Sequence, residues 1–151
     1  MLSLLLVLNL QFTPPKDLPM TPVEHRTQVD VFVDFKCTYC KTALEELQNM
    51  QKDYLFDINV RHLPLSDDSR TKSLYAICNP DQAIELFDKD VDHTECTLSE
   101  DTLKKLQIDT VYTDSNLVDK TPTIIIGKNK IEGLAPRENL ARFLIKKQNS
   151  N

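Results

Sequence analysis

A chain of 151 residues is long enough for one domain with an ordinary hydrophobic core, and its net charge of −5 disfavours nucleic acid and anionic membranes as partners. Apolar residues make up 40% and charged residues 27%, a composition typical of soluble globular proteins. Only two glycines are present, so a glycine-rich phosphate loop is absent and the common nucleotide-dependent enzymes are disfavoured.

The first twelve residues, MLSLLLVLNLQF, are almost entirely apolar. They are too few to span a bilayer, which needs about 20 residues, and they fit the apolar core of a secretory signal peptide. No Lys or Arg precedes the run and no clear small-x-small cleavage site follows it, so a misassigned start or a strand packed on the domain are alternatives. The proline-rich stretch TPPKDLPMTP predicts an extended linker. We expect residues 1–27 to be an export segment with a linker, and residues 28–151 to be the folded domain.

The stretch QVDVFVDF, residues 28–35, predicts a strand, because apolar side chains occupy alternate positions and Phe32 suggests partial burial of the second face. Apolar residues then recur at helical spacing and predict a helix from about 37 to 53. Cys37 falls where the strand ends and the helix begins. Cys40 lies one turn into the helix, so it should be the more buried of the two.

The rest of the chain predicts further strands and helices, with proline and capping residues near their ends. These elements are a strand over 56–65, helical pieces over 67–79 and 81–90, a helix over 97–108, a strand over 122–127, an edge strand within 128–133 and a terminal helix over 136–148. Ser99 is the expected N-cap of the helix over 97–108. This order predicts an α/β fold with a small mixed sheet flanked by helices.

The CxxC motif, Cys37 and Cys40, suits thiol–disulfide exchange. Unpaired N–H groups and the helix dipole should stabilise a thiolate at the start of the helix, and Lys36 and Lys41 add positive charge. An exposed thiolate can attack a disulfide, and a neighbouring thiol can resolve the mixed disulfide. This chemistry needs no organic cofactor and no metal. The even number of cysteines, four, fits an oxidising compartment.

Zinc sites use the same spacing, so CxxC alone does not decide the function. A rival set of four ligands exists: Cys37, Cys40, His93 and Cys96. A purely structural disulfide between Cys37 and Cys40 is disfavoured, because a two-residue loop closes little chain entropy. The alternative function is therefore a non-enzymatic interaction module, held together by zinc or by a disulfide.

Five stretches in consistent order, VFVDFKCTYC, HLPL, SLYAICN, HTEC and KTPTIIIGKNKIEGLAP, resemble the catalytic domain of the DsbC/DsbG family of bacterial periplasmic disulfide isomerases. The similarity covers roughly residues 28–147. Thr38 stands where the family usually has glycine after the first cysteine. Val31 stands where thioredoxin itself has a buried acid, which agrees with a DsbC-like rather than a cytosolic thioredoxin assignment.

The resemblance implies a thioredoxin fold with a helical insertion, and a periplasmic protein disulfide oxidoreductase or isomerase. It implies that Cys37 is the nucleophile and that Cys40 resolves the mixed disulfide. A cis peptide bond at Thr121–Pro122 should present a backbone edge to protein substrates. Tyr39 should offer an aromatic face to apolar substrate segments.

The resemblance also implies a structural disulfide between Cys78 and Cys96 in the helical insertion, and a redox partner such as a membrane reductase or oxidase. The family carries an N-terminal dimerisation domain, whereas only about 27 residues precede the domain here. We therefore expect a monomer, or at most a weak dimer, that oxidises or reduces substrates better than it isomerises them. Asp34 is interpreted as a solvated or strand-end residue, with assistance to proton transfer from Cys40 as the alternative. His62 has no recognisable partner.

Overall fold

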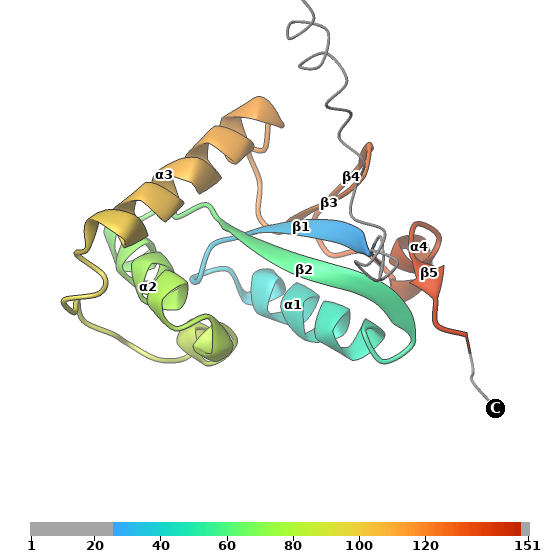
Figure 1. Cartoon of the computed structure of the whole chain (residues 1–151), viewed down its shortest axis with the longest axis horizontal. Coiled ribbons are helices and arrows are strands. Elements are labelled where there is room, and N and C mark those ends of the chain that lie inside the picture. Colours follow the sequence, from blue (N-terminus) through green and yellow to red (C-terminus); the bar gives the residue numbers. More distant parts are fainter. Residues whose placement is uncertain (1–25, 149–151) are drawn as a thin grey trace, which may run out of the picture.

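The computed structural model describes residues 26–148, which form a five-stranded mixed sheet with helices packed around it (Figure 1). The elements are β1 (Thr27–Val33), α1 (Thr38–Met50), β2 (Tyr54–His62), α2 (Asp67–Cys78), α3 (Glu100–Ser115), β3 (Thr123–Ile126), β4 (Asn129–Glu132), α4 (Arg137–Ala141) and β5 (Ile145–Lys146). Most of the predicted export segment and linker, residues 1–25, lies outside the described residues. Between residues 26 and 148, no helix has the length and apolar character needed to cross a membrane.

The strand order is β4-β3-β1-β2-β5, with β1 and β2 parallel and all other neighbours antiparallel. The parallel pair is joined through α1, and the helices α2 and α3 lie between β2 and β3 in the sequence. The predicted α/β class, the mixed sheet and the helical insertion are confirmed.

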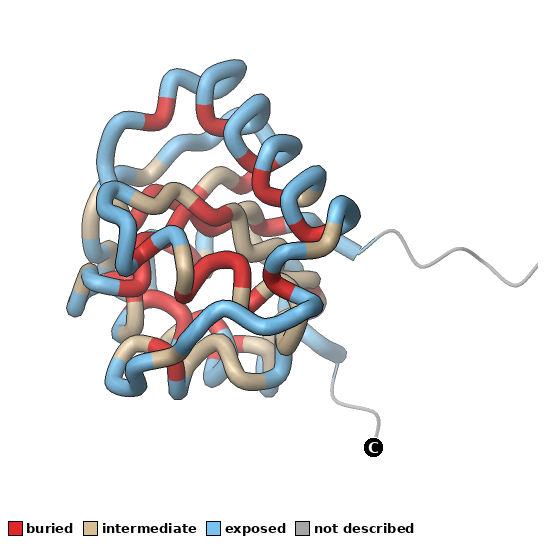
Figure 2. The backbone as a smooth tube through the Cα atoms, turned by 90° about the vertical axis from the view of Figure 1, so that its left-hand side faces the viewer, coloured by how far each residue is buried: buried red, intermediate tan, exposed pale blue. Residues whose placement is uncertain are grey.

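Strand β1 lies at the centre of the sheet and is buried on one face and partly buried on the other. Val29, Val31 and Val33 are fully buried on the first face, where Val31 lies opposite Val60 of β2 and Ile124 of β3. On the second face Phe32 is buried, whereas Gln28 is exposed, so the predicted partial burial of this face is confirmed. Figure 2 shows the buried backbone gathered inside a shell of exposed helices and loops.

Helix α1 packs on the core through residues that recur every three or four positions. The buried positions are Cys40, Ala43, Leu44, Leu47 and Met50. This apolar stripe holds the helix against the sheet and so fixes the direction in which its first turn points. The predicted helix and its face agree with the structure.

The prediction of a helical piece over 81–90 is wrong in its length and type, because the chain makes two short 3-10 turns there, at Pro80–Gln82 and Glu85–Phe87. Their hydrogen bonds span three residues, as from the Ala83 N–H to the Pro80 carbonyl. Leu86 is the only fully buried side chain of the two turns, so tertiary packing gives little support to a longer α-helix.

The terminal helix is also shorter than predicted. Helix α4 ends at Ala141, and the chain then turns and pairs as β5 with the start of β2, where Ile145 lies opposite Leu55. The Lys147 N–H donates to the Asp53 carbonyl at 2.8 Å. Leu140 of α4 is buried. An open sheet edge offered backbone partners that the sequence pattern does not reveal.

Candidate active site

Cys37 lies at the open N-terminus of α1. A turn after β1 is closed by a hydrogen bond from the Cys37 N–H to the Asp34 carbonyl at 2.9 Å. Cys37 is the N-cap of α1, and its Sγ accepts a hydrogen bond from the Cys40 N–H at 3.3 Å. The sulfur therefore lies beside the unpaired N–H groups of the first turn, where a negative charge is stabilised. Cys37 is partly exposed, so a second sulfur atom can reach it.

Cys40 lies in a contrasting environment, fully buried on the inner face of α1. Burial raises the pKa of the Cys40 thiol to about 12, and the hydrogen bond with the Cys37 sulfur adds to this increase. Cys40 is therefore protonated at neutral pH. One exposed sulfur and one buried, proton-bearing sulfur are thus held in a single helical turn.

The loop before β3 lies against the CxxC motif although it is far away in sequence. The Cys37 Sγ is 3.6 Å from the Thr121 carbonyl oxygen and donates to it. The Thr121–Pro122 peptide bond is cis, as the resemblance predicts. Thr121 is half-buried and Pro122 is buried, whereas Asp119 and Lys120 just before them are exposed.

This loop is fixed at both of its ends by the hairpin of β3 and β4. The Gly133 N–H donates to the Pro122 carbonyl at 2.8 Å. The Lys130 ammonium group donates to the carbonyls of Asn116 and Leu117, at 3.1 and 2.7 Å, where α3 ends and the loop begins. The position of Thr121 relative to Cys37 is therefore determined by the hairpin of β3 and β4.

Asp34 is buried directly below the turn that carries Cys37. Its two carboxylate oxygens accept backbone N–H groups from Lys36 at 2.9 Å and from Leu65 at 3.2 Å. Asp34 directly follows β1, as the strand-end interpretation predicts, but it is buried and not solvated. Its hydrogen bonds connect the turn after β1 with the segment after β2. Assistance to proton transfer stays a prediction.

Tyr39 is 64% exposed in the first turn of α1, beside Cys40 in the sequence. Its contact with substrates stays a prediction.

A groove of about 640 Å³ lies elsewhere, between α1, β2 and the end of α2. Ile58, Val60 and Ile77 are among the residues that line it, and neither cysteine of the CxxC motif does. This groove is therefore separate from the partly exposed Cys37.

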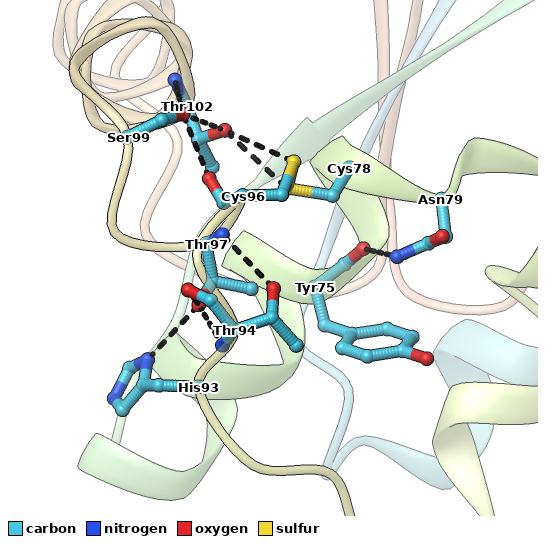
Figure 3. Close-up of a disulfide and its surroundings, with 9 residues drawn as sticks. All are labelled: Tyr75, Cys78, Asn79, His93, Thr94, Cys96, Thr97, Ser99 and Thr102. Atoms are coloured by element: carbon cyan, nitrogen blue, oxygen red, sulfur yellow. Dashed lines mark hydrogen bonds between the residues drawn. A yellow bond between two sulfur atoms is a disulfide. The ribbon is translucent and has the colours of Figure 1, made fainter.

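Cys78 and Cys96 form a disulfide that joins the end of α2 to the turn before α3 (Figure 3). Their Cα atoms are 6.1 Å apart, and the Thr102 hydroxyl lies 3.4 Å from the Cys78 sulfur. Figure 3 also shows the hydrogen bonds between Thr94 and Thr97 that shape this turn. The pair stabilises the helical insertion.

The rival zinc site is overturned by this disulfide, because the Cys96 sulfur is bonded to Cys78 and cannot serve as a ligand. His93 is a surface residue whose ring nitrogens hydrogen-bond to Thr71 and Thr97. Across residues 26–148, no three His, Cys, Asp or Glu side chains converge as they would around a metal ion.

A buried ionic cluster near the end of β2 was missed by the sequence analysis. Asp109 of α3 is fully buried and accepts the backbone N–H of His62 at 3.2 Å and its ring Nδ1 at 2.8 Å. Lys105 and Arg61 also bind its carboxylate. Burial alone would raise the pKa of Asp109, but the hydrogen bonds from His62 and Lys105 outweigh it and lower the pKa. The only sequence signal was the spacing of Lys105 and Asp109, four residues apart.

Comparison with known proteins finds one similar family model and several solved structures of similar fold. The family model for the DsbA-like thioredoxin domain matches residues 28–94. No curated protein matches the chain. Among solved structures, a periplasmic thioredoxin-like protein from Salmonella enterica serovar Typhimurium is 22% identical, with a TM-score of 0.63 over 78% of this chain and 81% of that one.

Two further solved structures agree. The catalytic domain of Proteus mirabilis ScsC is 18% identical, with a TM-score of 0.61 over 78% of this chain and 80% of that one. Pseudomonas aeruginosa DsbA2 is 17% identical, with a TM-score of 0.62 over 78% of this chain and 86% of that one. The finer resemblance to DsbC and DsbG is not tested by these matches. Together with the mixed sheet and its helical insertion, they show that residues 26–148 have a thioredoxin-like fold.

Proposed function

We propose that this protein is a thiol–disulfide oxidoreductase that acts on cysteines of other proteins. The observation that carries the proposal is the asymmetry of the CxxC motif. Cys37 is partly exposed and hydrogen-bonded by the Cys40 N–H, whereas Cys40 is buried and protonated. The match of residues 28–94 to the DsbA-like domain supports the same chemistry.

In the reducing direction, the Cys37 thiolate attacks one sulfur of a substrate disulfide. A bond forms between Cys37 and that sulfur, and the other substrate sulfur leaves as a thiolate that takes up a proton. Cys40 then loses its proton and attacks the Cys37 sulfur, which releases the second substrate thiolate. Two electrons have passed to the substrate and Cys37–Cys40 is oxidised. The oxidising direction is the exact reverse of these steps.

The backbone around Thr121 is the proposed docking edge for the substrate. An extended substrate segment could pair with this edge and so bring its disulfide to the Cys37 sulfur, 3.6 Å from the Thr121 oxygen. Tyr39 is proposed to contact apolar side chains of that segment, since most of its ring is exposed.

Export to the periplasm is part of the proposal. The Cys78–Cys96 disulfide suits an oxidising compartment, and the apolar start of the chain suits an export signal. The Salmonella protein of similar fold is described as periplasmic. In that compartment a membrane reductase or oxidase is the proposed redox partner.

The finer assignment, a DsbC/DsbG-like protein that acts mainly as an oxidant or reductant, rests on the order of sequence motifs. We propose a monomer or weak dimer with poor recovery of a scrambled multi-disulfide substrate. A tight dimer that restores such a substrate efficiently without added thiol would instead identify an isomerase. Sedimentation of the mature protein and the recovery assay distinguish the two outcomes.

The activity itself is tested by reduction of insulin with dithiothreitol as the electron source. We expect the wild type to accelerate it, Cys37→Ser to abolish the acceleration, and Cys40→Ala to accumulate mixed disulfides with insulin. Equilibration with glutathione then gives the direction of electron flow: a potential near about −120 mV marks an oxidant and one near about −270 mV a reductant. A wild type without effect would leave a disulfide-stapled interaction module as the function.

A further inference from the structure

Asp34 accepts three backbone hydrogen bonds at the point where β1 gives way to the CxxC motif. Its carboxylate binds the N–H groups of Lys36 and Leu65, and its own carbonyl accepts the Cys37 N–H. Asp34 is 5% exposed, whereas Lys36 is exposed and Leu65 is 66% exposed, so the bonds lie at the boundary between the core and the surface. Hydrogen bonds to a charged acceptor are stronger than neutral ones, and here N–H groups from two separate segments share one carboxylate.

The position of these bonds explains what they do. The ladder between β1 and β2 ends with the Leu63 N–H, which donates to the Val33 carbonyl at 2.9 Å. Beyond this point the two chains diverge, one into the CxxC turn and the other toward Ser66, the N-cap of α2. The Asp34 carboxylate bridges the two diverging segments one residue after the ladder stops.

We propose that Asp34 is a positioning residue for the exchange reaction, an inference that rests on the proposed function. Its carboxylate fixes the turn from residue 34 to residue 37 against the segment after β2. This turn then fixes the Cys37 sulfur relative to the Cys40 N–H and the Thr121 carbonyl.

Asp34→Asn tests this role, because it keeps the shape of the side chain and removes one acceptor. The amide can accept one N–H, but its NH₂ group then faces the other N–H, so the turn must shift. A displacement of about 1 Å can slow a reaction about 100-fold. We expect the attack of reduced protein on glutathione disulfide to fall about 10-fold to 100-fold at the high-pH plateau of the pH–rate profile.

Asp68→Asn is the matched control. The Lys36 ammonium and the Asp68 carboxylate, 2.9 Å apart, join the same two segments, and the substitution removes the same unit of charge at an exposed site. We expect its plateau rate to stay within twofold of the wild type. Asp34→Glu keeps both acceptors on a longer side chain, and we expect it to fall between the wild type and Asp34→Asn.

The shape of the pH–rate profile separates the possible results. A lower plateau supports positioning. A plateau equal to the wild type, with the midpoint moved to lower pH, shows that Asp34 acts only through its charge and overturns the inference. A lower melting temperature with an unchanged plateau shows a structural role only and also overturns it. If Asp34→Asn does not fold, Asp34→Glu with a wild-type plateau overturns it.

Failure of the proposed function gives a different result. A wild type that reacts neither with glutathione disulfide nor with insulin overturns the function and this inference with it. A reactive wild type with an equally reactive Asp34→Asn overturns the inference alone.

Discussion

The two cysteine pairs of this chain differ in almost every property that decides what a pair of sulfurs does. Cys37 and Cys40 are free thiols within one helical turn, and the backbone N–H of one binds the sulfur of the other. Cys78 and Cys96 are bonded to each other across 18 residues of chain. The first pair lies beside a loop that leaves its outer sulfur open, while the second joins two helical segments.

The difference shows how the length of the closed loop separates the two roles. A disulfide stabilises a fold mainly by restricting the unfolded chain, and this effect grows with the length of the loop. Opening a bond between Cys37 and Cys40 therefore changes the stability of the fold little, so the pair can be oxidised and reduced repeatedly. Opening the Cys78–Cys96 bond releases a long segment.

The largest expected effect tests the asymmetry within the first pair. At pH 7 a thiol with a pKa of about 12 is a thiolate in about one molecule in 10⁵. In reduced protein we expect iodoacetamide to label Cys37 at least about 100-fold faster than Cys40, and labelling of Cys40 to accelerate only toward pH 12. Peptide mapping by mass spectrometry gives both rates, and protein unfolded in urea is the control. Faster labelling of Cys40 would refute the assignment of Cys37 as nucleophile.

The second prediction concerns the ionic cluster around Asp109, which joins α3 to β2. Asp109→Asn should lower the free energy of unfolding by about 3 kcal/mol, because it removes the buried charge that binds His62 and Lys105, whereas Arg61 keeps its ion pair with Asp30. The pKa of Asp109 is lowered in the folded state, so its contribution is complete above the unfolded value of about 3.9 and is lost as the pH falls through the folded value.

Urea titrations at several pH values check this prediction. The difference between the wild type and Asp109→Asn should be constant near neutral pH and shrink below about pH 4. Asp114→Asn, an exposed position on the same helix, is the matched control and should change little. A difference that grows on acidification would contradict the lowered pKa.

The third prediction tests whether the Cys78–Cys96 disulfide stabilises the fold without taking part in thiol–disulfide exchange. Replacing both Cys78 and Cys96 by Ser should lower the free energy of unfolding by about 3 kcal/mol, the value for a loop of this length. Insulin reduction per folded molecule should remain. Calorimetry and the insulin assay on the same sample provide the two measurements. Loss of activity in a fully folded variant would mean that electrons pass through this pair.

The smallest effect is expected at the exposed ion pair between Lys36, beside the CxxC motif, and Asp68 of α2. The hydrogen bond to Asp68 raises the pKa of Lys36, which is protonated at neutral pH in either case. Both side chains are more than half exposed, so water and salt screen the pair. Asp68→Asn should leave the urea midpoint unchanged between pH 6 and 8. A clear loss of stability would show that this surface pair contributes as much as a buried one.

The elements with strong apolar periodicity were predictable from the sequence, and those that depend on distant partners were not. Strand β1 and helix α1 followed from alternation and from the recurrence of apolar side chains. Helix α3 continues to Ser115, seven residues beyond its predicted end, because Asp109 and Thr113 extend its buried face with polar groups. A periodicity of apolar residues cannot detect such positions.

The same reasoning applies to the candidate site. The CxxC motif and its place at a helix start came from local sequence, whereas the proximity of Thr121 came only through family resemblance. His62 had no visible partner, because Asp109 lies 47 residues away in the sequence. The backbone contacts of Asp34 depend on how two strands diverge, which no local pattern encodes.

The hairpin that holds the loop before β3 affects the entropy of substrate binding. Gly133 and Lys130 hold this loop through bonds to Pro122, Asn116 and Leu117, all made by the protein itself. The cost of ordering the loop is therefore met during folding. If substrates pair with the Thr121 backbone as proposed, the enzyme side of that pairing is preorganised, and most of the entropy lost on association comes from the substrate. Flexible or partly unfolded segments would then bind transiently and leave readily after exchange.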